Sequence, residues 1–232
     1  MTRTITSLAC LAQLLLVVVA TSSGQDAQPS AKEQEEKLIA VLRSAATRQE
    51  KADACRELAR KGTKDAVAPL AALLGDEKLA HMARYGLEPI PDPAVDDALR
   101  GALDSLKGRP LVGVIGSIGV RRDAKSVGRL ITLLKDQDGQ VARAAARALG
   151  RFGTPAAAKA IEGALADTPA PNQLAFCEGL FRCAEGLLAH GQQADALAIY
   201  DRLTRAQVPP QVRDAAARKT HFLREKAGPT LG

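Results

Sequence analysis

A short helix-ending pattern recurs along the chain and limits what it can fold into. A leucine or isoleucine followed four places later by glycine, or by a near substitute for this glycine, begins at residues 58, 87, 115, 149, 187 and 223. Successive copies are 28 to 38 residues apart. Self-similarity at this spacing, with one helix pair per copy, is typical of an α-solenoid. The sequence therefore predicts an all-α fold of about six antiparallel helix pairs.

The best-preserved copy of the repeat spans residues 136–157. One apolar stripe follows the helical period: Val141, Ala145, Ala148, Leu149 and Phe152. Asp138 stands at the N-cap, Gly153 at the place of a left-handed residue after the helix, and Pro155 at the first position of the next helix. Three arginines lie four residues apart on roughly the opposite face: Arg143, Arg147 and Arg151. The apolar period, the N-cap and the glycine after the helix all predict a helix over 140–152.

The composition suits closely packed helices. Aromatic residues are 3% of the chain and tryptophan is absent, so the core must consist of alanine, leucine, valine and isoleucine. A β-sandwich or barrel would need many β-branched and aromatic residues at alternate positions. A net charge of +6 indicates a solvated surface with a mild basic bias.

The apolar periodicity divides the chain into helix pairs. The expected pairs are 33–46 with 49–61, 66–74 with 77–87, 95–106 with 111–120, 124–135 with 140–152, 155–165 with 172–190, and 193–205 with 210–226. The segment 111–120 alone would also suit a buried strand, and its Gly-x-x-Gly-x-x-Gly spacing resembles a phosphate-binding loop, but the Gly-Lys-Ser/Thr ending of such a loop is missing. Because VIGSIG at 114–119 aligns with ALGRFG at 148–153, we expect a glycine-rich helix that its neighbours approach closely.

The N-terminal residues follow a different pattern. Arg3 precedes a mostly apolar run over 8–20, and Ala20-Thr21-Ser22 resembles a cleavage site. This layout is typical of a secretory signal peptide, although an uncleaved membrane anchor is the alternative. We expect a signal peptide at 1–24, a disordered leader at 25–32, the solenoid at 33–228 and a tail at 229–232. The protein would then be exported, to a periplasm or beyond.

No catalytic, metal or cofactor site is expected from the sequence. Three cysteines remain after the signal peptide (Cys55, Cys177 and Cys183), and the last two are too far apart on one helix for a disulfide. We interpret all three as small core residues. The histidines His81, His190 and His221 fall on different repeats. The acid pairs Asp96-Asp97 and Asp136/Asp138 lie near helix starts, where capping accounts for them.

The residues also resemble a known family. Leu133–Asp138 followed by Val141–Gly150 is similar to the HEAT-repeat proteins, in particular to the short bacterial HEAT-like repeats also found in phycobilin lyase subunits. Ala66–Leu74 with Asp76 resembles a partial second copy, whereas Ala196–Tyr200 is more similar to a tetratricopeptide helix. The resemblance implies a non-catalytic scaffold that offers an extended surface to another protein. A lyase or chaperone-like subunit that handles a tetrapyrrole is the alternative by family analogy.

The arginine face of residues 143, 147 and 151 is the candidate partner-binding surface. With Arg121, Arg122, Lys125 and Arg129 it would form a basic ridge, which in a HEAT-like protein can bind nucleic acid. Export, the interspersed acidic residues and the lack of stacking aromatics favour a solvated face or an acidic protein partner instead. The segment 227–231 resembles the start of another repeat, so this end is either a short natural cap or a place of self-association.

Overall fold

The computed structural model describes residues 29–226. The expected signal peptide, the tail at 229–232 and the first part of the leader lie outside these residues. The described part of the chain is built of helices and turns, without a strand. The twelve α-helices it contains are α1 (Ala31–Arg43), α2 (Arg48–Lys61), α3 (Val67–Ala71), α4 (Ala80–Leu87), α5 (Pro93–Ser105), α6 (Gly108–Arg121), α7 (Val127–Leu133), α8 (Gly139–Phe152), α9 (Pro155–Leu165), α10 (Ala170–Ala189), α11 (Gln193–Arg205) and α12 (Pro210–Lys226).

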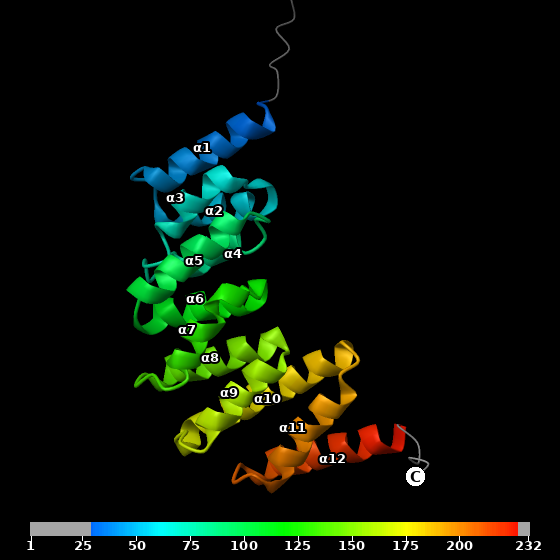
Figure 1. The fold of residues 1–232 in the computed structure, drawn as a ribbon. Coiled ribbons are helices and arrows are strands. Elements are labelled where there is room, and N and C mark those ends of the chain that lie inside the picture. The colour runs from blue at the N-terminus through cyan, green and yellow to red at the C-terminus, as the bar shows by residue number, and fades with distance from the viewer. Residues whose placement is uncertain (1–28, 227–232) are drawn as a thin grey trace, which may run out of the picture.

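The helices follow one another as stacked pairs from the top to the bottom of Figure 1. We call the odd-numbered helices A helices and the even-numbered ones B helices. Among the B helices, α2 packs on α4, α4 on α6, α6 on α8 and α8 on α10. Each A helix packs on the B helix of its own pair. The buried apolar residues form one continuous core that runs through all six pairs. The prediction of an all-α solenoid is confirmed.

The observed helix boundaries lie within three residues of the expected ones. Helix α4 begins at Ala80 rather than at residue 77, and α6 begins at Gly108 rather than at residue 111. Residues 66–74 and 124–135 were expected to be single helices, but each begins with a turn of 3-10 helix, at Lys64–Ala66 and Ala124–Ser126. The first helix begins at Ala31 because Ser30 caps it, two residues earlier than expected. Residues 111–120 lie inside α6, so the strand alternative was wrong for this segment.

The most regular repeat has the caps that its sequence predicts. The Asp138 carboxylate accepts a hydrogen bond of 2.8 Å from the backbone amide of Gln140. At the other end Gly153 has φ +62°, a left-handed conformation that costs glycine little. The stripe residues Val141, Ala145 and Leu149 are buried. Local signals in the sequence therefore place this helix and orient it.

Glycines bring the B helices α6, α8 and α10 into backbone contact. A Cβ atom on Gly119 would lie 2.9 Å from the Ala148 Cα, and one on Gly150 would lie 2.6 Å from the Gly179 carbonyl oxygen. Gly153 and Gly186 approach in the same way. The core is thus filled by close approach of the helices rather than by large aromatic side chains, as the composition predicts.

A partly buried arginine holds the proline-rich break after α4. The Arg121 guanidinium donates hydrogen bonds of 2.9 Å to the carbonyl oxygens of Glu88 and Ile90, and it forms an ion pair with Asp96. These bonds fix the segment in which Pro91 replaces the usual glycine. Asp96 therefore binds an arginine rather than capping α5, where Asp92 is the cap. Arg121 is a structural residue and not part of an exposed ridge.

The last pair is arranged differently from the others. Helix α11 packs on α10 and on α12. Hollows remain between α9 and α11 and between α10 and α12. The different packing of α11 and α12 occurs where the sequence changes from the HEAT-like pattern. The likeness of this pair to tetratricopeptide repeats stays a prediction.

Candidate functional site

The structure places the three predicted arginines in a row on the exposed side of α8. Arg143 donates a hydrogen bond of 2.8 Å to the side-chain oxygen of Asn172, and Arg147 pairs with Glu178 at 2.7 Å. Both partners belong to α10. Two of the three arginines therefore bind the neighbouring B helix in addition to facing solvent, which the sequence did not indicate.

Arg151, the third arginine, leans in the opposite direction. Its Cδ atom would lie 3.2 Å from a Cβ atom on Gly119 of α6, so the side chain passes over this glycine. It is exposed, and it forms no hydrogen bond or ion pair within residues 29–226. Arg151 is the member of the predicted set whose guanidinium is free for a partner.

The structure engages part of the wider basic ridge in ion pairs. Arg121 is held inside the fold, as described above, and Arg129 pairs with Asp104 at 3.1 Å across α5 and α7. Arg122 has φ +54° and ends α6. Lys125, like Arg122, is exposed. Ion pairs therefore engage two of the four residues that would extend the arginine face of α8.

The structure adds one arginine that the sequence analysis missed. Arg84 on α4 lies against Gly113 of α6, and a Cβ atom at Gly113 would overlap its guanidinium. Burial lowers the pKa of Arg84, while the nearby Glu88 carboxylate opposes this shift. No pattern around residue 84 could have revealed this, because its environment is created by a residue almost thirty places later in the chain.

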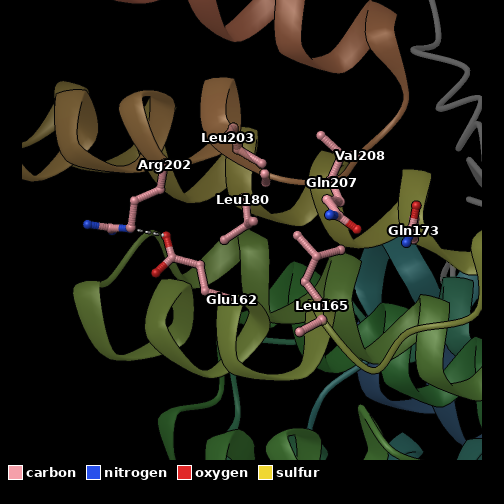
Figure 2. Close-up of a pocket in the computed structure, with 10 residues that line it drawn as sticks. Glu162, Leu165, Gln173, Leu180, Arg202, Leu203, Gln207 and Val208 are labelled. Carbon is pink, nitrogen blue, oxygen red and sulfur yellow. Dashed lines mark hydrogen bonds and ion pairs between the residues drawn. The ribbon is translucent and has the colours of Figure 1, made fainter.

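A hollow of about 420 Å³ lies between α9 and α11, with α10 as its floor. Figure 2 shows Leu165, Leu180, Leu203 and Val208 directed toward the same space from different elements. At one side the Arg202 guanidinium pairs with the Glu162 carboxylate at 2.9 Å. The charged groups that line the hollow thus neutralise each other. The hollow can accept apolar groups, but it brings together no set of side chains that suits acid–base or nucleophilic chemistry.

The histidines and the second acid pair do not form a site. His81, His190 and His221 lie on α4, at the end of α10 and on α12, all exposed. The Asp136 carboxylate accepts a hydrogen bond of 2.8 Å from the amide of Asp138, which is a local turn contact. Residues 29–226 contain no cluster of metal-ligating side chains.

The three cysteines are free and buried, as expected. Burial raises the pKa of the Cys55 and Cys177 thiols to about 11 and that of Cys183 to about 12. Protonated, inaccessible thiols are poor nucleophiles. The interpretation of these residues as core residues is confirmed.

None of the helices in the described part of the chain has both the length and the apolar character needed to cross a bilayer.

Comparison with known proteins supports the repeat assignment. The model of the family described as HEAT repeats matches residues 111–180, which cover most of α6, all of α8 and the first half of α10. A search of curated proteins gives no match. The matched segment includes the contacts of Gly119 and Gly150 and all three predicted arginines. The match supports a HEAT-repeat protein, a class of helical repeat that commonly mediates protein interactions.

Proposed function

We propose that this chain is a non-catalytic, exported HEAT-type scaffold that binds another protein on the exposed side of its B helices. The observation that carries the proposal is the backbone-level packing of α6, α8 and α10 through Gly119, Gly150 and Gly153. This packing makes three helices one rigid surface. A rigid, preformed surface loses little conformational entropy when a partner binds.

The chemistry of this surface suits a protein better than a small substrate. It carries arginines, of which Arg151 has no hydrogen-bond or ion-pair partner in the part of the chain that the structure describes. The exposed aromatic residue Tyr85 lies on the adjoining helix α4 with 51% of its surface accessible. Arginine and tyrosine are enriched where proteins bind one another. The acidic residues Glu178 and Glu185 on α10 lower the net positive charge, which disfavours a nucleic-acid partner.

Export is part of the proposal and rests on the N-terminal sequence alone. Expression in a bacterial host followed by fractionation of the envelope tests it directly. Sequencing of the N-terminus of the exported protein should show that residues before about position 25 have been removed. A full-length chain that stays with the membrane would favour the uncleaved anchor.

Two glycines on exposed helix faces provide a matched test of the binding surface. Gly116 is on the B helix α6 and Gly128 is on the A helix α7, and a Cβ atom at either would meet nothing within 4 Å. Replacing either by leucine should therefore leave the fold intact. We expect affinity capture from the native envelope to recover a partner with the unchanged protein and with Gly128→Leu, but not with Gly116→Leu.

Other outcomes of this experiment would contradict the proposal. Equal capture by both variants would show that the B-helix surface is not used. A captured protein fraction with visible absorbance would instead support the tetrapyrrole alternative. Binding to an oligonucleotide that weakens steeply with salt would support a nucleic-acid role.

A further inference from the structure

Two glycines of α6 lie against different neighbouring helices, and only one of them makes a backbone contact. Gly119 faces α8 and contacts its backbone, but Gly113 faces α4 and contacts the Arg84 side chain. Arg84 from one side and Arg151 from the other thus both lie over glycines of the same helix. A larger residue at Gly113 would displace the guanidinium of Arg84.

Arg84 is held in an unusual electrostatic state. It is half-buried and forms no hydrogen bond or ion pair within residues 29–226. Burial lowers its pKa. Glu88, the residue that ends α4, interacts electrostatically with Arg84, and its carboxylate accepts a hydrogen bond of 2.7 Å from the Ser117 hydroxyl. Desolvation of an unpaired guanidinium costs free energy. An anion that binds there would regain this energy through charge-assisted hydrogen bonds.

Between the two arginines the surface of α6 has almost no side chains. Gly116 is exposed, and a Cβ atom on it would meet nothing within 4 Å. Val112 and Val120 stand on either side of it along the helix. We call this surface, formed by Val112, Gly113, Gly116 and Val120 and bounded by Arg84 and Arg151, the α6 trough. Because glycine has no side chain, the backbone of a ligand can approach the trough closely.

We propose that the α6 trough binds an extended acidic segment of the partner protein, with one carboxylate on Arg84 and a second on Arg151. This inference rests on the proposed function and names the chemistry of its partner. Guanidinium groups bind carboxylates through paired hydrogen bonds, which gives such a contact both strength and orientation.

The positions of the glycines give the spacing of the carboxylates. Gly113 and Gly119 are six residues apart, which corresponds to about 9 Å along a helix axis. An extended chain covers this distance in about three residues. The expected ligand therefore carries two acidic residues about three positions apart in an extended segment.

An acidic polypeptide suits the trough better than a nucleic acid does. The affinity of a protein for duplex DNA depends largely on how many phosphates its basic side chains neutralise, whereas the trough offers two arginines, neither with a hydrogen-bond or ion-pair partner within residues 29–226. Two separated positive charges match two separated carboxylates.

Fluorescence anisotropy with the exported protein and short labelled peptides tests this inference. The probe is a ten-residue peptide of serine and alanine with two glutamates three positions apart, and its control has glutamines in the same places. We expect the glutamate peptide to bind at low ionic strength and the glutamine peptide not to bind. Peptides with glutamates adjacent to each other or far apart should bind more weakly.

Three variants assign the binding to the trough. Arg84→Gln and Arg151→Gln should each weaken binding roughly tenfold or more, because each removes a charge-assisted contact. Arg205→Gln changes an exposed arginine on α11 and should have no effect. Gly116→Leu should abolish binding without a change of charge. Circular dichroism confirms that each variant is folded, and Arg151, which is exposed, can be replaced safely if Arg84→Gln is unstable.

Several results would overturn the inference. They are equal binding of the glutamate and glutamine peptides, no binding of either, an equal effect of Arg205→Gln, and tighter binding of an oligonucleotide through the same two arginines. If the peptides fail but Gly116→Leu still prevents capture of the partner, the acidic-segment inference is wrong and the proposed function stands. If Gly116→Leu also leaves capture unchanged, the proposed function is wrong as well.

Discussion

The backbone contact between α8 and α10 makes a prediction that can be tested by comparing two glycine-to-alanine substitutions. A Cβ atom on Gly150 would lie 2.6 Å from the carbonyl oxygen and 2.8 Å from the Cα of Gly179. These are backbone atoms of another helix, so they cannot rotate away. A Cβ atom on Gly116, in the middle of α6, would meet nothing within 4 Å.

The two substitutions share one contribution to stability and differ in another. Alanine in place of glycine inside a helix stabilises the folded state by about 0.5–1 kcal/mol. This gain applies to both variants and cancels in their difference. Gly150→Ala must also push α8 and α10 apart, and overpacking of this kind costs about 1–3 kcal/mol. We therefore expect Gly116→Ala to be more stable than Gly150→Ala by about 1–3 kcal/mol.

Urea unfolding followed by far-ultraviolet circular dichroism measures this difference. The free energy of unfolding should rise for Gly116→Ala and fall or stay unchanged for Gly150→Ala, relative to the unchanged protein. If Gly150→Ala is as stable as Gly116→Ala, then α8 and α10 are not in backbone contact. The surface formed by α6, α8 and α10 would then not be held rigid by backbone contacts.

Four further predictions follow from the packing and the buried groups. Leu149→Ala should lower the free energy of unfolding by about 2–5 kcal/mol because Leu149 is fully buried, whereas Leu174→Ala, at a residue with 48% of its surface accessible, should change it by less than about 0.5 kcal/mol. Arg121→Met should cost about 3 kcal/mol, measured in the same way, because it leaves Asp96 and two carbonyl oxygens without their donor. The thiols, represented by Cys183, should resist a thiol reagent at neutral pH until urea is added. Because their folded pKa values of about 11 to 12 exceed the ordinary 9.0, their contribution to stability is complete below about pH 9 and is lost as the pH rises toward 12; a stability that stays constant through this range would contradict the burial. Sedimentation distinguishes self-association at the C-terminal end from a natural cap there: Phe222 on α12 has 59% of its surface accessible, so Phe222→Ser should shift any dimer toward monomer, and a chain that is monomeric at micromolar concentration favours the cap.

The repeat architecture was predictable because it depends on signals that are local in sequence. The apolar stripe of α8, its cap at Asp138 and its stop at Gly153 lie within one helix, where backbone hydrogen bonds link residues four apart. Their agreement located the helix to within one residue. The short A helices were less well predicted, since their first turns are wound as 3-10 helix to suit the packing around them.

The candidate site was predictable only in part. Helical spacing showed that Arg143, Arg147 and Arg151 share a face, and the structure confirms that they do. Helical spacing could not show that Arg143 and Arg147 bind Asn172 and Glu178, because these partners belong to a helix about thirty residues away.

The sequence by itself thus determined which segments are helices, which faces are apolar and that the pairs repeat. Only the tertiary structure decided which arginines are paired and which are free. Arg84 is the clearest case. Arg84 is half-buried and has no hydrogen bond or ion pair within residues 29–226. This state depends on how α4 and α6 lie against each other, an arrangement set by side-chain packing between helices, which leaves no periodic trace in the sequence around Arg84 or Gly113.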